Sequence, residues 1–210
     1  MGEGLPAYRL GIPRRPFIDP LGTYHVGSRG TYGRTLFDSI EEHECFLRMY
    51  GRVARKYRWT TLAWALMKNH HHLVIRLTEG GLSEGMRELH GGYSRWIHEM
   101  YDQTRKGHLF RHAFFARAIE DDADLLLTCT YVDLNPSINR PTAAPLRTDW
   151  CGYAATIGLA HPRRFHTPSP ILELFGDHPA VAQRRYRRHV EGEHARRSPD
   201  PSPNDVRERG

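Results

Sequence analysis

The sequence predicts an α+β fold in which helices pack against an antiparallel sheet, and three observations support this. Segments with strand-like alternation are interleaved with segments whose apolar residues recur at helical spacing. Two strand-like segments, 59–68 and 70–78, are joined tightly around Asn69. The order strand, helix, strand, strand, helix, strand, helix matches a split β-α-β unit with one added helix. The predicted class is therefore a ferredoxin-like split β-α-β antiparallel sheet with added helices.

The first elements follow from local signals. Residues 1–20 contain four prolines and predict an extended lead-in. Residues 23–30 begin as an alternating strand and end in turn residues. Ser39 and Glu42 form a capping-box pair, and apolar residues follow at helical spacing, so we expect a helix over 39–57.

The second half of the sheet unit is predicted in the same way. After the turn at 79–81, the apolar residues between Met86 and Met100 lie on one side of a helix. Residues 114–119 are the fourth strand. The acidic residues at 121–124 suit the first turn of the next helix. That helix must end near Asn135, because a residue that precedes proline disfavours α geometry.

These elements divide the chain into one domain with extensions. We expect the extended lead-in, a domain over 21–160 and a C-terminal extension over 161–195. Three apolar or aromatic residues mark an arginine-rich helix in that extension: Ala182, Tyr186 and Val190. Residues 196–210 are rich in charge and proline, which predicts a disordered tail.

Composition limits the class of protein. No apolar run is long enough to span a membrane, and no apolar signal core follows the N-terminal arginines. The three cysteines are widely spaced, which argues against a disulfide framework and fits a reducing cytoplasm. The net charge of +6 favours a polyanionic partner. Nearly all cations are arginines, which bind phosphate in a bidentate way, although a GC-rich gene would explain the same bias.

The histidine run 70–72 is the first candidate site. Successive side chains on a strand point to opposite faces, so His70 and His72 share a face that His71 does not. Two imidazoles on one face can act as a pair of metal ligands. An incidental polar strand end is the alternative, and the apolar flanks of the run disfavour it.

The helix that ends near Asn135 supplies the second part. Tyr131 and Asn135 lie four residues apart on one face. The predicted core stripe of this helix, Leu125, Cys129 and Val132, lies about a third of a turn away, so Tyr131 flanks it. If the helix packs beside the histidine strand, Asn135 can be a third ligand. The alternatives are a packed aromatic at 131 and a helix-capping role for Asn135.

A phenol near a metal-bound phosphodiester suggests a DNA-cutting reaction. Phenol has a pKa of about 10 and is a poor nucleophile unless base, metal or substrate assists it. Attack on phosphorus would release a 3′ hydroxyl and leave DNA joined to tyrosine through its 5′ phosphate. Tyr93 is the rival nucleophile, but its spacing within its own helix favours packing.

Over residues 20–160 the sequence resembles the HUH transposases with a single catalytic tyrosine, most closely the REP-associated tyrosine transposases. The resemblance rests on the segments 24–30, 67–73, 107–110, 131–136 and 150–153. It implies a ferredoxin-like fold, a divalent magnesium or manganese ion, single-stranded or hairpin DNA, and strand transfer without ATP. It also implies roles for four residues, with Tyr131 as nucleophile and His70, His72 and Asn135 as metal ligands.

Arginines are the predicted DNA contacts. Arg29, Arg111 and Arg117 are expected to bind phosphates near the site. Four more in the last helix form either a phosphate-tracking surface or a solvated face: Arg184, Arg185, Arg187 and Arg188.

The leading hypothesis is a metal-dependent tyrosine transposase, a monomer or homodimer with no membrane contact. Two alternatives stay open. One is a domesticated protein that binds DNA hairpins without cutting, and it is motivated by the sequence 111–117, which departs from the pattern of relatives. The other is a metallohydrolase in which His70 and His72 hold a metal-bound water, for which zinc would be suitable.

Overall fold

The computed structural model describes residues 18–101, 107–111, 114–137 and 150–197. Their elements, in chain order, are β1 (Thr23–Arg29), η1 (Thr31–Gly33), α1 (Ile40–Lys56), β2 (Thr60–Met67), β3 (His70–Arg76), α2 (Leu82–Met100), β4 (Phe115–Ile119), α3 (Asp122–Leu134), η2 (Asn135–Ser137), α4 (Tyr153–Thr156), α5 (Ser169–Leu172), η4 (Glu173–Phe175) and α6 (Pro179–Arg197). Residues 1–17 of the predicted lead-in lie outside the described part of the chain.

The four strands form one antiparallel sheet in the order β2-β3-β1-β4. This order, with α1 between β1 and β2 and α2 between β3 and β4, is the split β-α-β arrangement. The predicted α+β, ferredoxin-like fold is therefore confirmed. The strand pairing brings β1 and β3 to the centre of the sheet, next to each other.

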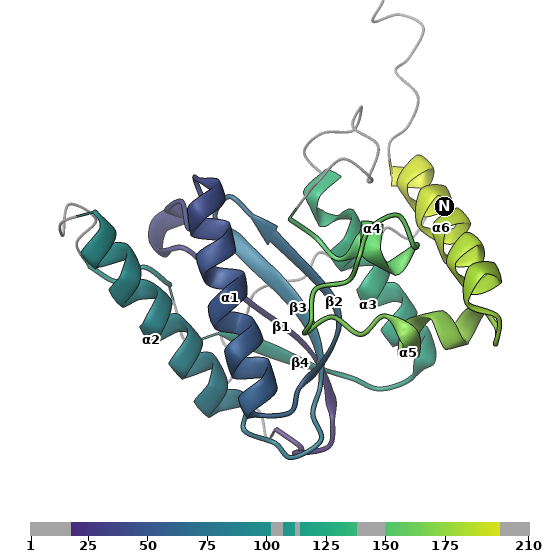
Figure 1. Ribbon diagram of the computed structural model, residues 1–210, viewed down its shortest axis with the longest axis horizontal. Coiled ribbons are helices and arrows are strands. Elements are labelled where there is room, and N and C mark those ends of the chain that lie inside the picture. Colours follow the sequence, from purple (N-terminus) through teal and green to yellow (C-terminus); the bar gives the residue numbers. More distant parts are fainter. Residues whose placement is uncertain (1–17, 102–106, 112–113, 138–149, 198–210) are drawn as a thin grey trace, which may run out of the picture.

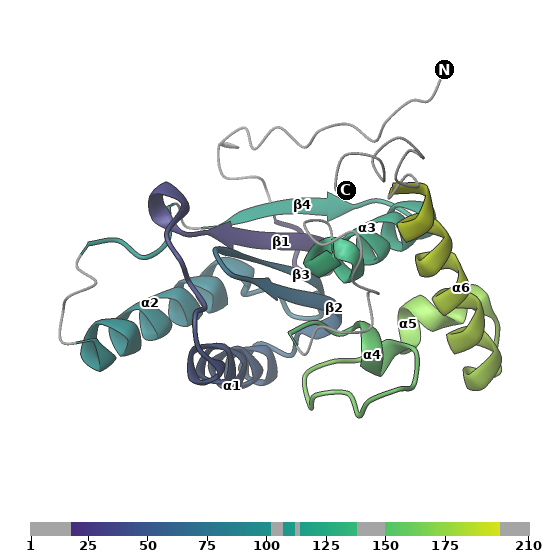
Figure 2. The same cartoon turned by 90° about the horizontal axis from the view of Figure 1, so that it is seen from above.

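Alternation along the strands gives the sheet two different apolar faces. Val26, Leu73 and Ile75 belong to a core that also contains the buried sides of α1 and α2. Ala65 and Val74 belong to a second core, shared with α3 and the C-terminal helices. The two helical layers accordingly lie on opposite faces, with α6 packed on the outer side of α3 (Figures 1 and 2).

The predicted helix ends agree closely with the structure. The Ser39 hydroxyl accepts a bond from the Glu42 amide at 3.2 Å, and the Glu42 carboxylate accepts one from the Ser39 amide at 3.4 Å. The Asp121 carboxylate caps α3 by accepting from the Asp124 amide at 2.8 Å. The α3 helix ends at Leu134, near the predicted end, but Asn135 keeps helical φ and ψ and begins the 3-10 turn η2, so the expectation that Pro136 excludes helical geometry from the residue before it is wrong.

The C-terminal extension packs on the same face as α3. Ala182, Tyr186 and Val190 are buried on α6, as their spacing predicts. Because α6 continues to Arg197, the first two residues of the predicted tail are helical, and residues 198–210 lie outside the described part of the chain. The domain boundary near residue 160 stays a prediction. None of the described helices is long and apolar enough to cross a bilayer.

Candidate active site

The histidine run begins β3 and points to both faces of the sheet, as predicted. His70 and His72 share the face that α3 covers, and their ring centroids lie 5.2 Å apart. His71 points the other way and is fully buried, with its ring 5.0 Å from Phe46 and 5.5 Å from His90. The pair and the single histidine therefore belong to separate environments.

The α3 helix brings the predicted tyrosine and amide to the histidine pair. The half-buried Tyr131 ring lies 5.4 Å from His72 and 5.9 Å from His25, measured between centroids. The Asn135 Oδ1 atom lies 3.4 Å from His70 Nε2, and Asn135 is only 8% exposed. The structure thus brings together all four residues that the sequence singled out for catalysis and metal binding.

The structure also bears on two alternatives, Tyr93 as the nucleophile and Asn135 as a helix cap. Tyr93 is fully buried on α2, on the far face of the sheet, and its hydroxyl donates to the Leu36 carbonyl at 2.7 Å. It packs, as its spacing predicted. Asn135 is the C-cap residue of α3, where its backbone N–H donates to the Val132 carbonyl, and its side-chain oxygen lies 3.4 Å from His70 Nε2, so one residue fills both positions.

The histidine pair is held in the neutral form that metal ligands require. Burial lowers the pKa of His70, an effect that hydrogen bonding of the protonated ring to Asn135 opposes and the charge of Arg29 reinforces. Burial also lowers the pKa of His72 well below its ordinary value, with further lowering by His25. Both imidazoles are therefore uncharged near neutral pH.

The polar atoms around His70 fit a bound cation. The Asn69 Oδ1 atom lies 2.7 Å from His70 Nδ1, and because an amide oxygen only accepts, this contact favours a ring proton on Nδ1. His70 Nε2 then carries a lone pair and faces a second acceptor, Asn135 Oδ1. Asn135 Nδ2 is buried without a partner among the described residues. A cation shared by the two acceptors would satisfy both of them.

The ligand set depends on the amide. The described residues contain no group of three His, Cys, Asp or Glu side chains that could hold a metal. Two imidazoles and an amide oxygen are nevertheless suitable donors for a divalent ion. If a metal binds His70 and His72, Asn135 could supply the third ligand.

His25 is part of this site, although the sequence analysis gave it no role. It lies on β1, and its Nε2 atom is 2.9 Å from Nδ1 of His72. Phe115 packs edge-on against the His25 ring at 5.1 Å, and a Cβ on Gly27 would lie 2.5 Å from the Phe115 ring. Burial, and then the charge of Arg117, lowers the pKa of His25 to about 3. A second neutral imidazole therefore lies directly behind His72.

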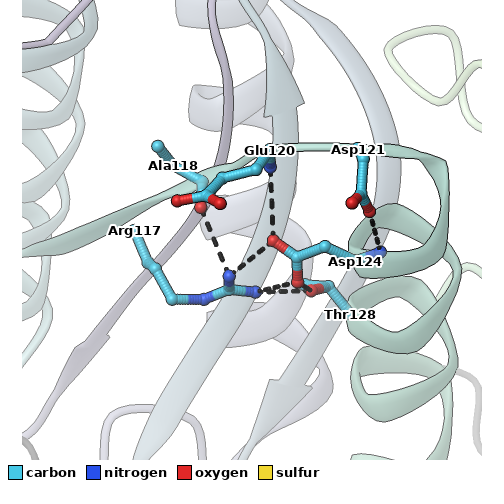
Figure 3. A network of polar contacts seen from close by, with 6 residues as sticks. All are labelled: Arg117, Ala118, Glu120, Asp121, Asp124 and Thr128. Carbon is cyan, nitrogen blue, oxygen red and sulfur yellow. Dashed lines mark hydrogen bonds and ion pairs between the residues drawn. The ribbon is translucent and has the colours of Figure 1, made fainter.

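Arg117 joins β4 to the start of α3 (Figure 3). Its guanidinium donates to both carboxylate oxygens of Asp124, at 2.7 and 2.9 Å, and to the Thr128 hydroxyl at 2.6 Å. The same bond to Arg117 lowers the pKa of Asp124. The sequence analysis expected a DNA phosphate at Arg117. That expectation is untested, and the guanidinium is engaged within the protein.

We expect Arg117→Ala to destabilise the fold by about 1–2 kcal/mol, because it removes a bidentate, partly exposed ion pair. Urea unfolding of the variant, compared with Arg187→Ala, checks this. Arg187 pairs with Glu191 on a single helix and its side chain is more exposed than that of Arg117, so its loss should change the unfolding free energy much less than the loss of Arg117. Equal stabilities for the two variants would contradict the role of Arg117 as a link between β4 and α3.

The sequence of this chain matches a known family. Residues 21–135 match the family described as "Transposase IS200 like". The matched segment spans more than half of the chain and ends at Asn135. The chain belongs to the IS200-like transposase family. Family membership assigns it to the transposases.

One solved structure resembles this IS200-like transposase in fold. A REP-associated tyrosine transposase, solved bound to a REP hairpin, is 16% identical with a TM-score of 0.60, covering 70% of this chain and 87% of its own. A putative transposase from Deinococcus radiodurans R1 is 14% identical with a TM-score of 0.41, covering 60% and 92%. No curated protein is significantly similar in sequence.

Beyond the matched segment, the C-terminal extension of this IS200-like transposase contacts the helix of Tyr131. The Tyr186 hydroxyl on α6 donates to Oδ2 of Asp133 at 2.7 Å. Asp133 is fully buried, and burial raises its pKa to about 7. The sequence analysis identified Tyr186 as apolar packing only and did not predict this bond.

Proposed function

We propose that this IS200-like transposase cleaves and rejoins single-stranded or hairpin DNA through a covalent 5′-phosphotyrosine at Tyr131. The observation that carries the proposal is the half-buried Tyr131 ring, which lies against His72 on the face of the sheet that also carries His70. A nucleophile of this kind must reach a substrate, and partial exposure allows that. The bound hairpin in the structural neighbour supports DNA as the partner.

His70, His72 and Asn135 are the proposed ligands of a magnesium or manganese ion. When bound, such an ion would polarise a non-bridging phosphate oxygen and so make phosphorus more electrophilic. The phenol oxygen of Tyr131 forms a bond to phosphorus, and the bond from phosphorus to the 3′ oxygen breaks. The phenol proton is lost and the leaving 3′ oxygen gains one. Rejoining reverses these steps, and the phosphotyrosine conserves the bond energy, so ATP is not required.

A denaturing gel with hairpin oligonucleotides tests the proposal. With magnesium or manganese, a 3′-labelled oligonucleotide should give a labelled protein band, and a 5′-labelled one should give a shorter free product. EDTA should remove both products, and added metal should restore them. Cleavage without a protein adduct would support the metallohydrolase instead. Tight hairpin binding without cleavage under any metal would support the non-cleaving hairpin-binding protein.

Exposed arginines near the site are the proposed phosphate contacts. Arg29 is exposed at the end of β1, opposite His70 in the strand register. The Arg111 amide donates to the Arg29 carbonyl at 2.8 Å, so the two residues lie side by side, and Arg111 is exposed as well.

Arg184 and Arg188 are exposed one turn apart on α6. Arg185 bonds to the Phe175 carbonyl at 2.8 Å, and Arg187 bonds to Glu191, so both are partly engaged.

We expect Arg29→Ala and Arg111→Ala each to weaken hairpin binding and to reduce the slope of log K against log salt by about 1. Fluorescence anisotropy at several salt concentrations measures both effects. Arg48→Ala is the matched control, because Arg48 is exposed on α1, which covers the other face of the sheet. An unchanged salt slope for Arg29→Ala and Arg111→Ala would exclude these phosphate contacts.

A further inference from the structure

The two candidate ligands on β3 have one feature in common. Each histidine has its Nδ1 atom within hydrogen-bond distance of a side chain that can accept. For His70 the partner is Asn69 Oδ1 at 2.7 Å, and for His72 it is His25 Nε2 at 2.9 Å. The two partners come from different elements, the β2-β3 turn and the neighbouring strand β1.

We propose that Asn69 and His25 are positioning residues that fix the ring protons of His70 and His72 on Nδ1, so that both rings present an unprotonated Nε2 to the divalent ion. This inference rests on the proposed function, because it concerns the same ligands. Neutral imidazole carries one proton, and the hydrogen bond at one nitrogen decides which nitrogen can bind a metal. Partners of this kind around metal sites also set ring orientation.

Asn69 has no backbone reason to be asparagine. Asparagine is favoured in tight turns because its side chain can bond to nearby backbone and because it tolerates a positive φ, and the side-chain contact described for Asn69 is to the His70 ring, not to backbone. Among the described residues other than glycine, only Tyr32 and Arg58 have a positive φ. The turn conformation at position 69 is therefore open to other side chains. The contact of the Asn69 amide oxygen, as acceptor, with His70 Nδ1 is the feature that favours asparagine here.

The surroundings of His25 hold it against His72. The residue is 4% exposed, its ring packs edge-on against Phe115, and Tyr131 lies on another side at 5.9 Å. Strand pairing aligns Gly27 with His72, so the His25 side chain lies two residues along on the same face of β1. A ring fixed in this way has little freedom to turn from Nδ1 of His72.

Matched pairs of variants separate hydrogen-bond acceptance from shape. His25→Gln keeps an acceptor at about the position of Nε2, whereas His25→Met has a similar length but no comparable acceptor. Asn69→Asp keeps the accepting oxygen, and Asn69→Leu removes it at similar volume. The buried His166 on the far side of β2 provides a control, His166→Met, that loses a buried imidazole elsewhere.

The first measurement is Mn²⁺ affinity without DNA, by EPR titration of the free ion. We expect His25→Met and Asn69→Leu each to weaken binding by about 10- to 100-fold. We expect His25→Gln, Asn69→Asp and His166→Met to stay close to the wild type. Wild-type affinity in both His25→Met and Asn69→Leu would overturn the inference, provided that His72→Ala binds Mn²⁺ poorly. If His72→Ala also binds normally, the metal site itself is wrong and the proposed function fails with it.

The second measurement needs no variant to fold. Nitrogen-15 NMR of the wild-type, metal-free protein distinguishes the two ring tautomers. The inference expects His70 and His72 to carry their protons on Nδ1. A proton on Nε2 of either ring would overturn it for that ring.

Discussion

Tyr131→Phe is expected to abolish the covalent protein–DNA adduct while hairpin binding stays unchanged. The substitution removes only the oxygen that is proposed to attack phosphorus. The phenylalanine ring can keep the contacts with His72 and His25, so the surroundings of the metal ligands should persist. Loss of a nucleophile typically reduces the rate by far more than about 10³-fold, so no adduct should be detected. A denaturing gel measures the adduct, and anisotropy measures the binding.

Tyr93→Phe is the matched control for this experiment. Tyr93 is the other helix tyrosine considered as nucleophile, and it lies on the opposite side of the sheet. Removing its hydroxyl leaves the buried Leu36 carbonyl without that donor, which should cost about 1–2 kcal/mol of stability. Adduct formation by the folded variant should be normal. An adduct that survives Tyr131→Phe and disappears in Tyr93→Phe would reverse the assignment.

Local signals were sufficient to predict the four strands, the four long helices and most of the candidate site, but not the short helices α4 and α5, which lie where a loop was expected. The alternation of β3 separated His70 and His72 from His71, and the four-residue spacing on α3 put Tyr131 and Asn135 on one face. These predictions depend only on the period of a strand or a helix. The sequence therefore predicted which residues share a face of β3 and which share a face of α3, and the packing of α3 on β3 then brings these residues together.

Long-range partners could not be predicted in the same way. His25 contacts His72 because Gly27 pairs with His72, and the sequence does not specify this register between β1 and β3. The acidic residues before α3 were interpreted as favourable charges at a helix N-terminus. One of them, Asp124, also binds Arg117, which belongs to the preceding strand. The partner of a side chain on another element depends on how the two elements pack. The periodicity of the sequence gives no information about that packing.

The bond between Asp133 and Tyr186 suggests how the C-terminal extension supports catalysis. Asp133 lies on α3 between the proposed nucleophile Tyr131 and the proposed ligand Asn135, and Tyr186 lies on α6. The extension therefore fixes the helix that carries Tyr131 from the side opposite the sheet. This bond joins the segment matched by the family, residues 21–135, to a helix outside that match.

Replacing this buried carboxyl should stabilise the protein, and the gain should grow with pH. Burial raises the pKa of Asp133 from 3.8 to about 7. A carboxyl whose folded pKa exceeds its unfolded pKa binds its proton more tightly in the folded state, so its contribution to stability falls as pH rises between these two values. Asp133→Asn is neutral at every pH and can still accept from Tyr186. Its unfolding free energy should exceed that of the wild type by an amount that increases by about 2 kcal/mol between pH 5.5 and 8.

Urea unfolding of both proteins across that pH range measures the difference directly. Several buried histidines, including His25 and His166, have lowered pKa values, so the stability of both proteins should fall as pH drops below about 6.5. This loss is common to the two proteins and cancels in the difference. Tyr186→Phe should lower stability at high pH, since it removes the donor that the buried carboxylate needs most when it is charged. A pH-independent difference between Asp133→Asn and the wild type would mean that Asp133 keeps an ordinary pKa, and that water reaches this carboxyl between α3 and α6.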